Sequence, residues 1–76
     1  MADRLPRVTA TQLLRALHAD GWREIRQTGS HRFLVHPSKR GQVNVPVHAT
    51  KTLKLGTLKG ILESAGLTAE DLRTLL

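Results

Sequence analysis

The chain of 76 residues contains no cysteine, no tyrosine, one tryptophan and one phenylalanine. Without cysteine, neither a disulfide nor a cysteine-ligated zinc ion can support so small a fold. No apolar run approaches the ~20 residues that a membrane-spanning helix requires, and the N-terminus lacks the apolar segment of a signal peptide. We therefore expect a cytoplasmic protein, without a membrane anchor, whose stability rests on a hydrophobic core.

Acidic residues are also scarce. Six Asp and Glu against twelve Lys and Arg give a net charge of +6. The basic residues are concentrated in the middle of the chain, and half of the six acids lie near its C-terminal end. A basic centre is typical of proteins that bind nucleic acid, although the same excess can simply keep a small protein soluble. Two aromatic residues are too few for a platform that stacks the successive bases of a single strand.

The length predicts one domain over residues 1–76, with a lead-in at 1–7 and a short terminal helix at 68–76. A chain of this size buries only ~60% of the surface that it exposes when unfolded. No large substrate cavity can form inside such a core, so a substrate is expected on the surface.

Three segments have the pattern of helices. Thr9 and Gln12 are spaced as a capping box, apolar residues at helical spacing follow, and Gly21 is placed to end this first helix. A second helix is predicted from about Thr57 to the residue before Gly66. A third, short helix is predicted to open at 68–71.

Three segments between the first two helices have the pattern of strands, at 22–27, 31–36 and 42–47. The second has apolar residues at both odd and even positions, and so on both faces of the strand. It is therefore expected in the centre of the sheet. Pro46 cannot donate to a ladder, so the third is expected at an edge. Trp22 and Ile25 do not alternate, which indicates either a bulge or a tryptophan that packs ahead of the strand. The prediction is an α+β fold of order α-β-β-β-α, with a three-stranded antiparallel sheet and helices on one face.

The turn at 28–30 and the residue after it are the candidate site. Histidine can act as a base or an acid near neutral pH. Gly29 allows the backbone to approach a phosphate, and Ser30 can donate a hydrogen bond to it. The alternative is that Gly29-Ser30 is only a hairpin turn and His31 only the first residue of a strand. His31 also shares its parity with Phe33, so it would face the core if Phe33 faces the helices.

Several fragments, in their order and spacing, resemble a HicA-type toxin over nearly the whole chain, from about Leu5 to Leu76. This family consists of small bacterial mRNA interferases of type II toxin–antitoxin systems. One position differs from the family: Leu55 stands where many members carry proline. We expect this difference to affect the start of the second helix. The fragments are Leu5-Pro6-Arg7-Val8-Thr9, Gly21-Trp22, Arg26-Gln27-Thr28-Gly29-Ser30-His31, His36-Pro37, Val45-Pro46-Val47-His48 and Leu53-Lys54-Leu55-Gly56-Thr57-Leu58.

The resemblance implies a fold similar to the double-stranded-RNA-binding domain, a catalytic histidine at His31, and neutralisation by a HicB-type antitoxin that covers the basic face and His31. RNA can be cleaved without a metal because its 2′-hydroxyl is a built-in nucleophile, so neither a metal nor another cofactor is expected. His36 and His48 could each supply a second proton-transfer group, or could serve structure or RNA contact. The residues expected to contact RNA are Arg26, Gly29, Ser30, Arg32, Lys39, Arg40, Lys51 and Lys54.

Two other function classes remain open at this point. A non-catalytic double-stranded-RNA-binding module of the same fold would use the same basic residues and would not need His31. A protein-interaction domain would use its charge only to match an acidic partner. Cleavage of RNA that depends on His31 would distinguish the mRNA-cleaving toxin from both alternatives.

Overall fold

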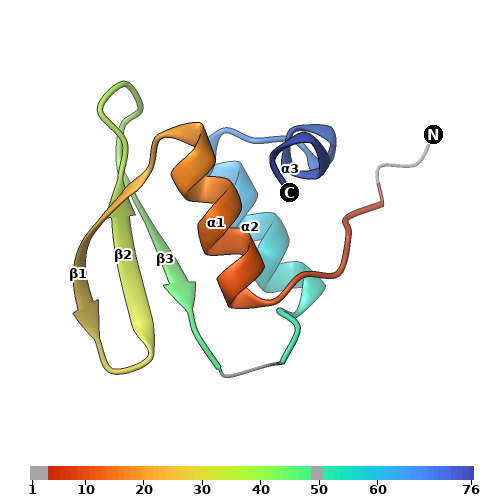
Figure 1. The fold of residues 1–76 in the computed structure, drawn as a ribbon, viewed down its shortest axis with the longest axis horizontal. Coiled ribbons are helices and arrows are strands. Elements are labelled where there is room, and N and C mark those ends of the chain that lie inside the picture. The colour runs from red at the N-terminus through yellow and green to blue at the C-terminus, as the bar shows by residue number, and fades with distance from the viewer. Residues whose placement is uncertain (1–3, 49–50) are drawn as a thin grey trace.

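A computed structural model describes residues 4–48 and 51–76. The start of the predicted lead-in and the middle of the connection that precedes the second helix lie outside these residues. The elements follow in the order α1 (Ala10–Asp20), β1 (Arg23–Thr28), β2 (His31–Val35), β3 (Gln42–Pro46), α2 (Leu55–Ala65) and α3 (Ala69–Leu75) (Figure 1). This is the predicted α+β order, with the short terminal helix in its expected place.

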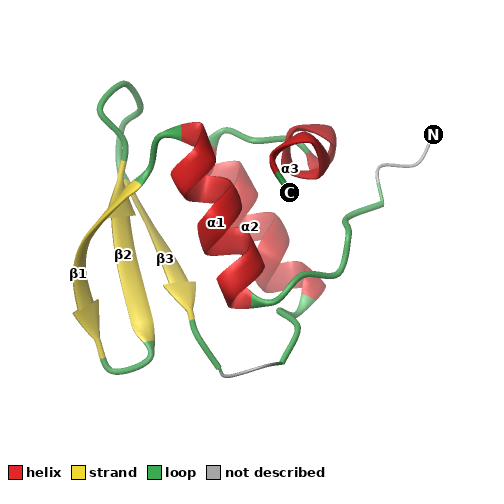
Figure 2. Ribbon diagram, viewed as in Figure 1, coloured by secondary structure: helices red, strands yellow, loops and turns green. Residues whose placement is uncertain are grey.

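The strands form an antiparallel sheet in the order β1-β2-β3. As predicted, β2 is central and the proline-bearing β3 lies at an edge. Trp22 precedes β1 and is buried, and the register of β1 slips between Glu24 and Arg26, so both explanations of the irregular pattern are correct. Figure 2 shows the sheet as one layer, with the helices gathered beside it.

The first helix begins and ends where its local sequence predicts. The Thr9 hydroxyl accepts a hydrogen bond from the Gln12 N–H at 3.2 Å, and the Gln12 side chain accepts one from the Thr9 N–H at 2.9 Å. Gly21 then takes a left-handed conformation at φ 110° and ends the helix. A side chain at Gly21 would also meet the His36 ring, because a Cβ built there lies 2.7 Å from Nε2. This position therefore requires glycine for two independent reasons.

The core lies between the helices and one face of the sheet. Leu34 of β2 and Val43 and Val45 of β3 are buried there, whereas every residue of β1 is exposed. Among residues 4–48 and 51–76, no helix has the length and apolar character that crossing a bilayer requires. The largest fully buried side chains are Trp22, Leu13, Leu17, Leu34, Leu58, Leu72, Val43 and Val45.

The second helix starts at Leu55, two residues earlier than predicted. Lys54 is its N-cap in an extended conformation, with φ −64° and ψ 142°, and its side chain makes no capping hydrogen bond. The first helical position tolerates many residues because its N–H has no partner inside the helix. The sequence pattern places this start too late because Leu55 and Gly56 contribute no buried side chain that would mark the first turn.

Leu55→Pro is expected to raise the free energy of unfolding by about 0.4–1 kcal/mol. Proline favours the first helical position, and Lys54 already has the extended conformation that the residue before a proline requires. Urea unfolding followed by circular dichroism measures the change. Lys59→Pro, in the interior of the same helix, is the control and should lower stability by about 3 kcal/mol. An equal decrease in the free energy of unfolding of the two variants would contradict the observed helix start.

Candidate active site

The side chain of His31 lies on the face of the sheet that carries no helix. Leu34 is buried against the helices, so the alternate residues His31, Phe33 and Val35 point to the other side. The parity that His31 shares with Phe33 therefore directs it outward, and the possibility that it faces the core is wrong. His31 is the first residue of β2, so it lies at the end of the sheet where a turn joins β1 to β2. Figure 1 shows this turn.

A hydrogen bond to Asn44 orients the imidazole of His31. Nδ1 of His31 lies 3.0 Å from Oδ1 of Asn44. An amide oxygen can only accept, so Nδ1 carries the proton and donates it. In the neutral ring Nε2 is then the unprotonated nitrogen, which is the form that a general base needs. Both side chains are exposed, so this nitrogen is accessible to a surface substrate.

A stacked pair lies next to His31 on the same face. The guanidinium carbon of Arg26 lies 4.5 Å from the centroid of the Phe33 ring, and the two residues are partners in the ladder between β1 and β2. The next partners along this ladder on the same face are Thr28 and His31. Stacking holds the Arg26 cation over the sheet, where it can contact a phosphate close to the imidazole.

The remaining side chains of this face carry no negative charge. Glu24 is the only acidic residue of the three strands, and its partner in the ladder is the buried Leu34, so it points to the helix side. The face is therefore suited to a polyanion. The strand residues that the register places on it are Arg23, Arg26, Thr28, His31, Phe33, Val35, Gln42, Asn44 and Pro46.

The turn before His31 exposes its backbone. Gly29 has φ 58°, and a Cβ built on it would meet no atom within 4 Å. Two-residue hairpin turns with glycine at a positive φ match the twist of the flanking strands. The Ser30 carbonyl accepts a hydrogen bond from the Val47 N–H at 2.6 Å, which ties the turn to the end of β3. Arg26, Gly29 and Ser30 are thus the predicted contact residues that the structure brings together with His31.

Arg32 is on the other side of the sheet. It shares its parity with the buried Leu34, and its NH1 group lies 3.0 Å from Oε1 of Glu24 in an ion pair. Its guanidinium therefore does not join the surface that carries His31. The ion pair links β2 to the exposed strand β1 on the helix side.

Two further predicted contacts lie in the loop that follows β2, at the opposite end of the strand from His31. The ammonium group of Lys39 donates to Oδ2 of Asp20 at 2.7 Å and to the Ala65 carbonyl at 2.9 Å. It therefore connects the C-terminal ends of α1 and α2. Arg40 is exposed in the same loop. Neither residue is brought together with His31.

His36 has a structural role in the fold. Its Nδ1 accepts a hydrogen bond from the Ser38 N–H at 3.0 Å, so its Nε2 carries the proton and donates to the Asp20 carbonyl at 2.7 Å. The ring also packs edge-on against Trp22, with centroids 5.3 Å apart. Both ring nitrogens are therefore engaged, and His36 lies at the end of the sheet away from His31.

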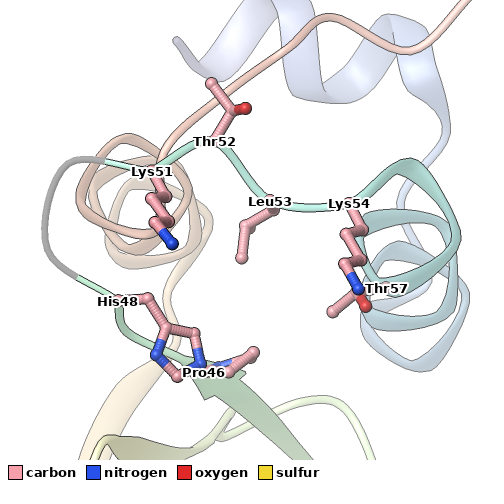
Figure 3. A pocket seen from close by; sticks show the side chains of 7 residues that line it. All are labelled: Pro46, His48, Lys51, Thr52, Leu53, Lys54 and Thr57. Carbon is pink, nitrogen blue, oxygen red and sulfur yellow. The ribbon is translucent and has the colours of Figure 1, made fainter.

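Lys51 and Lys54, the last predicted contacts, line a hollow between the end of β3 and the start of α2 (Figure 3). His48 and Pro46 line it from the side of the sheet. Pro46 is the partner of His31 in the β2–β3 ladder, so this hollow borders the end of the sheet that carries the imidazole.

Asn44 was not predicted to be a site residue. Its only signal in the sequence is that it is the polar residue between Val43 and Val45, which places it on the face opposite to the core. Its contact with His31 depends on the register between β2 and β3. Within the described part of the chain, no three metal-ligating side chains gather closely enough to hold a metal ion.

Residues 10–67 match the family model described as the HicA toxin of bacterial toxin–antitoxin systems. The match extends from the first residue of α1 to the residue after the glycine that ends α2. It includes β1, β2 and β3, and therefore His31, Asn44 and the turn that precedes β2. Comparison with curated proteins gave no match.

Proposed function

The chain belongs to the family of HicA toxins of bacterial toxin–antitoxin systems, and we propose that it is an endoribonuclease that cleaves mRNA with His31 and without a metal ion. The observation that carries this proposal is the hydrogen bond between Nδ1 of His31 and Oδ1 of Asn44. In the neutral ring it leaves Nε2 unprotonated, on an exposed face of the sheet whose strand residues include no acid. Such a face can receive the sugar–phosphate backbone of RNA.

In the proposed reaction, Nε2 of His31 takes the proton of the 2′-hydroxyl. The 2′-oxygen attacks the adjacent phosphorus, and the bond from phosphorus to the 5′-oxygen breaks. Arg26 and the backbone at Gly29-Ser30 offset the charge that develops on the phosphoryl oxygens. The departing 5′-oxygen needs a proton. His36 and the α1 residue His18 lie at the opposite end of the sheet from His31, so His48 is the histidine placed to donate this proton.

A toxin of this kind has an antitoxin partner, and we propose that the partner is of the HicB type and covers the helix-free face of the sheet together with His31. The positive charge of this face would attract an acidic surface, and an occupied face would exclude RNA. Because mRNA is the proposed substrate, the toxin would act in the cytoplasm. Release of the antitoxin would expose His31 and stop translation.

The purified toxin, incubated with labelled RNA in the presence of EDTA, is expected to cut the RNA and to leave DNA of the same sequence intact. DNA binds through the same phosphates but lacks the 2′-hydroxyl, so it serves as the matched control. Gel electrophoresis of the products measures the cutting. Binding of both polymers without cutting of either would instead favour the non-catalytic RNA-binding module.

A further inference from the structure

The hollow between the end of β3 and the start of α2 is a feature separate from the imidazole of His31. Its volume is about 670 Å³. Figure 3 shows the Lys51 and Lys54 side chains extending from one segment toward the side on which His48 and Thr57 lie, with Leu53 between the two lysines. The lining residues are Pro46, His48, Lys51, Thr52, Leu53, Lys54 and Thr57.

Backbone contacts fix the wall of this hollow. The Leu53 N–H donates to the Val8 carbonyl at 2.8 Å, and Thr52 forms a bridge with Thr9. Leu53 is buried, with 7% of its surface exposed. The segment that carries the two lysines is therefore attached to the residues that precede α1. This fixes the backbone positions from which the two side chains extend.

The chemistry of the lining favours an anion. Two ammonium groups, an imidazole and the Thr57 hydroxyl can all donate hydrogen bonds, and no lining residue is acidic. The ion pairs found among the described residues involve other cations, Arg32 and Lys39. The first turn of α2 contains no acid either, so the positive end of this helix adds to the same potential.

The position of the hollow relates it to the proposed cleavage site. Pro46 lines the hollow and is also the ladder partner of His31. The Val47 N–H, one residue later, donates to the carbonyl of Ser30 in the turn before His31. An RNA strand with one phosphate at His31 can thus pass across the end of β3 and place a neighbouring phosphate between the lysines.

We propose that this hollow is a subsite for a phosphate group of the RNA strand that flanks the phosphate being cleaved. The subsite rests on the proposed ribonuclease function and extends it, because it assigns Lys51, Lys54 and Thr57 to substrate binding rather than to the reaction. It also means that the toxin recognises a strand of several nucleotides and holds it at two separated points.

The test compares two double variants that lose the same charge. Lys51→Ala with Lys54→Ala removes the subsite, and Arg15→Ala with Lys59→Ala removes two exposed cations that do not line the hollow. Affinity for a 2′-deoxy oligonucleotide is measured by fluorescence anisotropy over a range of salt concentrations. The subsite variant should bind about tenfold more weakly, and the slope of log affinity against log salt should fall by about 0.7 for each lost phosphate contact.

The binding assay requires no cleavage, so its result is independent of whether His31 is catalytic. Equal affinities and equal salt slopes in the two double variants would overturn the subsite, even if the toxin cuts RNA. A loss of antitoxin binding together with unchanged oligonucleotide affinity would assign the hollow to the antitoxin and would also overturn it. If the subsite variant binds the oligonucleotide more weakly but the wild type never cuts RNA, the result would support phosphate binding in the hollow and reject the ribonuclease function.

Discussion

His31→Ala is expected to lower the rate constant for RNA cleavage by about 10²–10⁴-fold, the range that a single general base or acid contributes. Alanine removes the nitrogen that takes the proton of the 2′-hydroxyl and leaves Arg26 and the turn in place. Affinity for RNA should change little, because the phosphate contacts do not pass through the imidazole. Single-turnover cleavage of labelled RNA measures the rate, and expression of the variant should no longer arrest growth.

His18→Ala is the matched control for this prediction. His18 is an exposed histidine on α1, so the substitution removes the same group far from the proposed site. Both variants should unfold at the temperature of the wild type, because neither side chain is buried. A loss of cleavage in His18→Ala as large as that in His31→Ala would show that the effect is not specific to the site.

Asn44→Ala is expected to lower the cleavage rate constant by about 10–100-fold. The substitution removes the acceptor for Nδ1–H of His31, so the ring can rotate and take the other tautomer. This range corresponds to about 1.4–2.8 kcal/mol, and the imidazole becomes charged as it takes the proton, when a hydrogen bond to it contributes about 1.5–3 kcal/mol. The rate should fall at saturating substrate, because binding does not depend on the tautomer.

Asn44→Asp tests the same contact through the pH dependence. A carboxylate at Asn44 would still accept from Nδ1–H, but its charge would favour the protonated imidazole. A base must be neutral to act, so the pH at which the rate is half-maximal should shift upward. Gln42→Ala, which removes an amide from the same strand and face, should change neither the rate nor the pH profile. An unchanged profile in Asn44→Asp would argue against the orienting role.

The elements of the fold were predictable because their signals are local. The capping box of Thr9 and Gln12 and the left-handed Gly21 set the limits of α1 within a few residues of the chain. Pro46 identifies an edge strand because proline lacks the N–H that a central strand needs. The start of α2 was harder to predict because its first turn depends on backbone conformation at Lys54 and has no side-chain cap.

The candidate site was only partly predictable because it depends on contacts between strands. β2 is apolar on both parities, so the pattern alone could not show whether His31 or Leu34 faces the helices. Lys39 is of a residue type that often binds phosphate, yet its ammonium group donates to Asp20 and to the Ala65 carbonyl. Asn44 lies 13 residues from His31 in sequence, and the register of the β2–β3 ladder brings the two side chains together.

The ends of the cleaved fragments test the central proposal most directly. Mass spectrometry of the products formed in EDTA should show a 2′,3′-cyclic phosphate on one fragment and a 5′-hydroxyl on the other, because the 2′-oxygen is the nucleophile. The wild type and His18→Ala should form these products, and His31→Ala should not form them in the same time. Fragments with a 5′-phosphate and a 3′-hydroxyl, or cyclic products formed by His31→Ala at the wild-type rate, would contradict the role proposed for His31.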